Sequence, residues 1–342
     1  MVLVLGALVA SIALGLAPES AKEAENETPP ATATRGKDEI SSTAHQRATA
    51  TTTRTLAPTA TDTPQVLPSA TPSPTPSSTA THMPSPTPTA TPSDHYWLER
   101  PIAPEKNDRV ARFYDYASRA DGTYPIHHGV EFVNDSGTPA LAVAPGTVIV
   151  AGDDLTQVYG ARTNFYGKLV ILELDRRYDG KPVYVLYGHL AKVEVKVDQH
   201  VETGERIGLV GMTGVAEGPH IHMEVRYGEN DYGKTVNPEL WLTPKEGVGT
   251  LAGTILSPTG EPLPEVKLIL YRANQPEDAV REVMTYPDKE VNPDPLWKEN
   301  FATGDVEAGE WLVKLYHKGR LYTKKVSVQS GATTWLTIRT RE

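Results

Sequence analysis

The chain contains 342 residues, of which 39% are hydrophobic, and a length of this order allows two domains. Its formal net charge of −10, together with the lack of a clustered basic run, argues against nucleic acid as a partner. The absence of cysteine excludes disulfide scaffolds, thiolate metal sites and cysteine nucleophiles, so any bound metal must be held by nitrogen and oxygen ligands.

The first segment, from Val2 to Ala17, is apolar or small throughout except for Ser11. A membrane-spanning helix needs about 20 such residues and the core of a signal peptide about 7–15. Because the segment lies between these lengths, we expect residues 1–25 to be either a signal peptide or a membrane anchor. No Lys or Arg precedes it, which suggests a start further upstream. In both cases the rest of the chain is expected to be extracellular or in the cell envelope.

A segment dominated by Ala, Thr, Ser and Pro follows and occupies most of residues 26–94. It buries too little apolar surface to offset the entropy lost on ordering, so we predict that residues 26–94 are disordered. The frequent prolines favour extended polyproline II conformation, at roughly 3.1 Å per residue. We expect this segment to act as a stalk; the alternative is a passive linker.

The composition changes at His95, where aromatic residues become frequent. Short apolar runs follow, rich in Val, Ile, Leu and Tyr and separated by Gly, Pro, Asn and Asp. Because they carry no sustained helical period, they are typical of strands in an antiparallel sheet. We therefore predict a mainly β domain over residues 95–245. The expected strands are Thr147–Ala151, Lys168–Leu174, Val183–Leu190, Arg206–Val210 and His220–Arg226.

A domain boundary is expected after Trp241, and residues 246–342 form the second predicted domain. Short apolar runs recur there, separated by turn signals such as the one at Pro258. Several strands at this spacing in under a hundred residues indicate a small β-sandwich, and we find no catalytic constellation in it. The expected strands are Val266–Leu270, Trp311–Leu315, Lys325–Val328 and Thr334–Ile338.

Two histidines are separated by one residue in the expected strand that begins at His220. Residues i and i+2 of a strand project to the same face, so His220 and His222 should point together while Ile221 and Met223 face the core. Both imidazoles could reach one metal, or one could bind it while the other acts on the substrate. The alternative is a solvated pair on a polar strand face.

A second pattern combines His127 and Glu131. Gly129 makes a helix unfavourable, so we expect a bend near it to bring the two side chains together. A histidine and a carboxylate placed in this way suit zinc. The alternative is that Glu131 is a surface carboxylate. For His128 and His200 we expect no functional role, with His128 merely exposed.

A third histidine, His189, ends the apolar strand that begins at Val183. An imidazole in that position costs desolvation free energy unless it is paired or used in chemistry. By itself this pattern most often indicates a structural histidine.

Taken in chain order, the motifs resemble a known family. In order, these motifs are HHGVEF, GTP, APGTV, YGHL and GPHIHMEV. Together they are similar to the motifs of the lysostaphin/LytM-type metalloendopeptidases, and the similarity extends from about Trp97 to Trp241. The C-terminal residues 253–311 more distantly resemble the carboxypeptidase-regulatory-like β-sandwiches, which implies a structural or adhesive module.

The first resemblance implies a zinc ion (Zn2+) held by His127, Glu131 and His222, with an open fourth position for water. His189 and His220 would be the catalytic histidines: one accepts a proton from the attacking water, and together they stabilise the tetrahedral oxyanion. Three protein ligands and an open position define a catalytic zinc site. The family has aspartate where this chain has Glu131, which adds one methylene.

The leading hypothesis is an exported zinc endopeptidase that cuts the stem peptides or cross-bridges of bacterial peptidoglycan. The first alternative is a catalytically degenerate LytM-type module that binds cell wall or activates another hydrolase. A purely adhesive, stalked surface protein is the second alternative, but it leaves the histidines without a role.

Overall fold

The computed structural model describes residues 92–287 and 289–342. The predicted signal peptide or anchor at residues 1–25 and the predicted linker, apart from its last three residues, lie outside the described residues. Within the described part, no helix is long and apolar enough to cross a membrane. The only helices found there are two 3-10 turns, η1 (Tyr232–Lys234) and η2 (Pro238–Leu240), so the predicted mainly β fold is confirmed.

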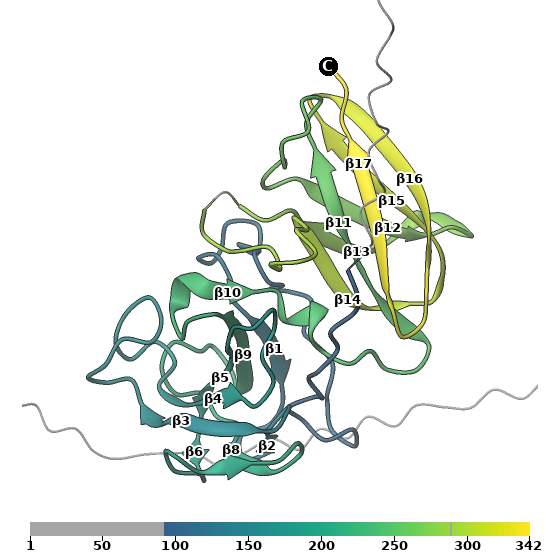
Figure 1. The fold of residues 1–342 in the computed structure, drawn as a ribbon. Coiled ribbons are helices and arrows are strands. Elements are labelled where there is room, and N and C mark those ends of the chain that lie inside the picture. Colours follow the sequence, from purple (N-terminus) through teal and green to yellow (C-terminus); the bar gives the residue numbers. More distant parts are fainter. Residues whose placement is uncertain (1–91, 288) are drawn as a thin grey trace, which may run out of the picture. The chain divides into compact units, whose positions relative to one another are not determined.

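The first half of the described chain forms a seven-stranded antiparallel sheet with the order β1-β9-β5-β4-β3-β7 (Figure 1). β10 pairs with the C-terminal part of β9. A smaller sheet has the order β2-β8-β6. The strands are β1 (Val130–Val133), β2 (Pro139–Leu141), β3 (Gly146–Asp153), β4 (Lys168–Leu174), β5 (Val183–Leu190), β6 (Lys192–Val193), β7 (His200–Val201), β8 (Arg206–Leu209), β9 (His220–Tyr227) and β10 (Thr235–Val236).

The second half forms two sheets, with the orders β14-β11-β17 and β13-β12-β15-β16. Side chains from both, such as Leu251 and Phe301 on one and Leu268 and Val313 on the other, share one buried cluster, as a sandwich requires. The strands are β11 (Val248–Leu256), β12 (Lys267–Arg272), β13 (Gln275–Met284), β14 (Phe301–Glu307), β15 (Gly309–His317), β16 (Arg320–Val328) and β17 (Thr333–Arg339).

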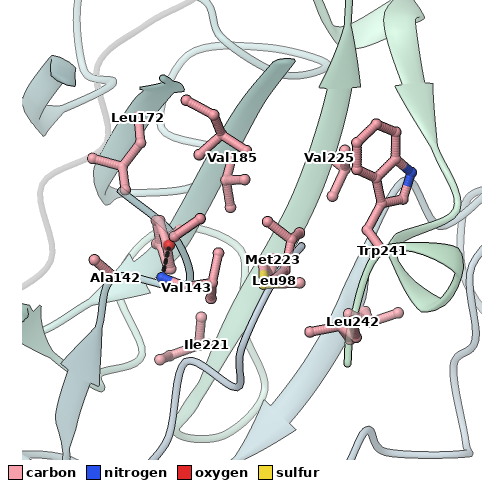
Figure 2. Packing of buried hydrophobic residues seen from close by; sticks show 14 of the residues in the cluster. Leu98, Ala142, Val143, Leu172, Val185, Ile221, Met223, Val225, Trp241 and Leu242 are labelled. Atoms are coloured by element: carbon pink, nitrogen blue, oxygen red, sulfur yellow. Dashed lines mark hydrogen bonds between the residues drawn. The ribbon is translucent and has the colours of Figure 1, made fainter. Parts of the chain in front are cut away.

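The alternation of side chains along β9 determines which face of the sheet carries the candidate site residues. Ile221, Met223 and Val225 are fully buried, and Figure 2 shows them along β9 in the cluster that also contains Val185 and Trp241. Each such side chain contributes roughly 1.5–3 kcal/mol by leaving water. This burial fixes the register of β9, so its other residues must project from the opposite face of the sheet.

The two halves are also in contact. Ala252 of β11 and Ala302 of β14 belong to the same core cluster as the first half, although β11 and β14 pair in the second. The domain boundary between residues 245 and 246 stays a prediction.

Candidate metal centre

Three predicted site residues converge at the start of β1 and β9. Glu131 on β1 lies directly opposite His222 on β9 in the antiparallel register, and His127 precedes β1 by three residues. The Nε2 atom of His127 lies 2.8 Å from Glu131 Oε1 and 3.1 Å from His222 Nδ1. The distance between His222 Nδ1 and Glu131 Oε1 is 3.2 Å. Three donor atoms thus form a small triangle, and all three side chains are buried.

The triangle fits a zinc ion. Ligand atoms at about 2.0–2.1 Å in a tetrahedron are about 3.3–3.4 Å apart, slightly more than the separations found here. Two imidazole nitrogens and one carboxylate oxygen are donors that zinc accepts. A small outward movement of the side chains would bring the three atoms to ligand spacing.

The electrostatics of the cluster favour a cation. Burial tends to raise the pKa of Glu131, but the facing His222 and the hydrogen bonds from the histidines outweigh it and hold that pKa well below its usual range. Burial lowers the pKa of His127, so its ring stays neutral, as a metal ligand must be. For His222 burial acts downward too, but Glu131 and Glu224 raise its pKa to about 9. The carboxylates of Glu131 and Glu224 therefore stabilise a positive charge within this cluster.

His189 and His220 lie beside the triangle, with ring centroids 4.7 Å apart. His189 Nδ1 donates to the carbonyl oxygen of Thr213 at 2.8 Å, and His220 Nδ1 donates to that of Gly218 at 2.7 Å. A carbonyl oxygen therefore holds the Nδ1 proton of each ring, and Nε2 is the remaining ring nitrogen. Burial, followed by the neighbouring His222, lowers the pKa of His189 to about 3.

Glu131 also reaches one of these two histidines. Its second carboxylate oxygen, Oε2, lies 2.8 Å from His220 Nε2. The side chain of Glu131 thus joins the candidate ligands to the candidate catalytic pair.

The backbone of His189 is unusual. Its φ angle of 61° lies in the left-handed region, which residues other than glycine rarely adopt. The amide nitrogen of His189 donates to the carbonyl oxygen of Tyr166 at 2.8 Å. The orientation of the His189 ring at the end of β5 therefore depends on a strained backbone conformation, which hydrogen bonds maintain.

A buried network behind His222 was missed by the sequence reasoning. His222 Nε2 lies 3.1 Å from Glu224 Oε1, and Arg226 donates to Glu224 Oε2 through Nε at 2.8 Å. The hydroxyl of Tyr166 also donates to Glu224. A carboxylate in this position orients a metal-binding imidazole. The sequence did carry a signal: His222, Glu224 and Arg226 follow one another at intervals of two.

His128 corrects one expectation. It is buried rather than exposed, because its ring stacks on Tyr232 at 3.8 Å and its Nδ1 lies 3.0 Å from Thr235 Oγ1. His128 does not join the triangle. His200 is exposed on β7, where its Nε2 lies 2.9 Å from Asp175.

Part of this chain is similar in sequence to known proteins. Residues 125–238 match the family model described as peptidase family M23. An uncharacterized metalloprotease of Haemophilus influenzae is 40% identical over 112 residues, which are 33% of this chain and 20% of that protein. The DD-carboxypeptidase/endopeptidase Mpg of Neisseria meningitidis serogroup B is 34% identical over 116 residues, 34% of this chain and 23% of that protein.

Among solved structures, the catalytic domain of the antimicrobial peptidase lysostaphin from Staphylococcus simulans is 26% identical. The match covers 38% of this chain and 88% of that one, with a TM-score of 0.31. The chain spans about a fifth of the length of the two curated relatives.

Proposed function

We propose that this chain is an exported zinc metalloendopeptidase that hydrolyses peptide bonds in bacterial peptidoglycan. The match of residues 125–238 to peptidase family M23 supports this proposal. The observation that carries the proposal is the triangle formed by His127 Nε2, Glu131 Oε1 and His222 Nδ1. The names of the relatives, among them a DD-carboxypeptidase/endopeptidase, support a substrate in the cell wall.

In this proposal His127, Glu131 and His222 hold the zinc ion. When bound, zinc supplies Lewis acidity, which polarises the scissile carbonyl and acidifies the attacking water. Glu224 keeps the Nδ1 atom of His222 turned toward the other two ligands through its contact with Nε2.

His189 and His220 are proposed as the catalytic pair. Their Nδ1 atoms are held by carbonyl oxygens, so the Nε2 atoms face the site. One ring accepts a proton from the attacking water and later delivers it to the leaving amine, and the two together stabilise the oxyanion. The substrate is a stem peptide or a cross-bridge, encountered in the cell envelope or outside the cell.

The test is hydrolysis of purified peptidoglycan by the full chain. New amino groups and released fragments, detected by mass spectrometry, should appear with zinc, disappear with a chelator and return when zinc is added back. His189→Ala serves as the matched control, because it should keep zinc but cut about 10²–10⁴-fold more slowly. A zinc-loaded wild-type protein that binds peptidoglycan but releases no fragments would favour the non-catalytic binding module instead.

A further inference from the structure

Residues 110–118, here called the covering segment, lie along the chain that carries two candidate ligands. The amide nitrogen of Ala111 donates to the carbonyl oxygen of Glu131 at 2.9 Å, and that of Ala117 donates to the carbonyl oxygen of His127 at 2.8 Å. His127 in turn donates its amide hydrogen to Ser118 at 3.0 Å. The main chain of both ligands is therefore held by this one segment.

The covering segment also contacts a ligand side chain. The ring of Tyr114 stacks on the imidazole of His127, with centroids 4.0 Å apart and an angle of 11° between the planes. Its hydroxyl donates to the carbonyl oxygen of Pro125 at 2.5 Å. A displacement of Tyr114 would leave the ring of His127 unsupported on one side.

Arg112 fastens the covering segment to the C-terminal sandwich. Its Nη1 donates to Glu239 Oε2 at 2.7 Å, and its Nη2 donates to the carbonyl oxygen of Gly304 on β14 at 3.0 Å. The same oxygen of the buried Glu239 accepts the amide hydrogen of Gly304 at 2.8 Å. Arg112, η2 and β14 thus meet at one point.

Glycine favours the close approach at this point, because a Cβ atom would displace the carboxylate of Glu239. A Cβ atom at position 304 would lie 2.9 Å from Glu239 Oε2, closer than real Cβ contacts allow. The sandwich therefore presents backbone, rather than a side chain, to the carboxylate that holds Arg112.

Tyr116 makes a second, independent link. Its hydroxyl donates to the carbonyl oxygen of Thr235 at 2.9 Å and accepts from the amide of Asn292 at 3.3 Å. Its ring packs edge-on against Tyr286 with centroids 5.3 Å apart. Residues of the sandwich half thus contact the covering segment at two positions, Arg112 and Tyr116.

We infer that the C-terminal sandwich is a positioning element of the metal centre, and that Arg112 is the positioning residue through which it holds His127 and Glu131 in ligand geometry. The chain of contacts runs from β14 through Arg112 to the covering segment and then to both ligands. This inference rests on the metal site of the proposed function. It gives the second half of the chain a role in that site.

The test compares Arg112→Met with Arg100→Met in the full chain. Arg100 also crosses between the halves, since it donates to both carboxylate oxygens of Asp305 at 2.8 and 3.2 Å, but it lies outside the covering segment. Removing Arg112 takes the arginine partner from Glu239. Removing Arg100 takes the two-point partner from Asp305, which keeps Arg112 at 3.6 Å. Only Arg112→Met should affect the ligands.

Three measurements separate positioning from general stability. In the metal-free protein, hydrogen exchange at the amides of Ala111 and Ala117 should accelerate in Arg112→Met and stay at the wild-type rate in Arg100→Met. Zinc affinity should fall about tenfold or more in Arg112→Met alone, by analogy with other residues behind metal ligands. The visible spectrum of the cobalt-substituted protein should change in that variant only.

If Arg112→Met does not fold, Arg112→Lys takes its place, because it keeps the charge but loses the forked contact with both Glu239 and Gly304. Equal zinc affinity, cobalt spectra and amide exchange in wild type and the folded Arg112 variant would overturn the inference. A wild-type protein that binds no zinc would instead refute the proposed function, so the two failures are distinguishable.

Discussion

Replacing Glu131 with aspartate tests the most unusual position of the candidate site. On the present backbone, Glu131→Asp retracts the carboxylate by one C–C bond, about 1.5 Å. The contact between Oε1 and His127 Nε2, now 2.8 Å, would lengthen to about 4 Å, and so would that between Oε2 and His220 Nε2. Ligand distances tolerate only about 0.2 Å. A misplacement of about 1 Å at a catalytic centre costs on the order of 10²-fold in rate.

We therefore expect Glu131→Asp to bind zinc more weakly and to cut peptidoglycan about 10²-fold more slowly. Zinc affinity is measured by competition with a chromogenic chelator, and hydrolysis by the release of new amino groups. Glu131→Gln is the matched control: it keeps the length but loses the charge, so zinc binding should weaken strongly. If Glu131→Asp binds zinc more tightly and cuts faster than wild type, then the reasoning is wrong and the natural protein is a degenerate relative.

Four further predictions concern single residues. His222→Ala should lose the zinc ion, because two remaining ligands are too few, and full occupancy by elemental analysis would contradict its assignment. His189→Ala and His220→Ala should retain zinc but lose hydrolysis by about 10²–10⁴-fold, whereas wild-type rates would remove them from the mechanism. Glu224→Gln should weaken zinc affinity about 10–100-fold, and an unchanged dissociation constant would show that His222 needs no such support. Burial, and then the charge of Asp294, raises the pKa of Glu299 to about 8 from 4.5, so the folded state binds a proton that the unfolded state releases. Stability should hence fall as pH rises from 4.5 to 8, and thermal melts of Glu299→Gln should show a weaker decline.

The local part of the site could be predicted from the sequence. The interval of two between His220 and His222 predicted a shared strand face, and β9 confirms it by burying Ile221 and Met223 on the other side. Such features depend only on local chain geometry, so they can be predicted from a single sequence. The bend at Gly129 is present too, and a Cβ atom there would lie 2.4 Å from the carbonyl oxygen of Met223.

The long-range part could not be predicted. Tyr166 precedes Glu224 by 58 residues, and Arg112 precedes Gly304 by 192, and no periodicity connects positions so far apart. His128 was misjudged for the same reason, because the ring that buries it comes from Tyr232. Such contacts depend on how separate sheets pack, which the local pattern leaves open.

The left-handed backbone of His189 bears on the orientation of its ring, which the proposed function places in catalysis. For a residue with a Cβ atom this conformation costs roughly 1–2 kcal/mol. It is maintained by the hydrogen bonds from its amide to Tyr166 and from its ring to Thr213. Folding of the protein therefore supplies the free energy needed to orient the imidazole of His189. Under the proposed function, binding of a peptide would not have to supply it, so the interaction energy with the substrate could be used to stabilise the transition state instead.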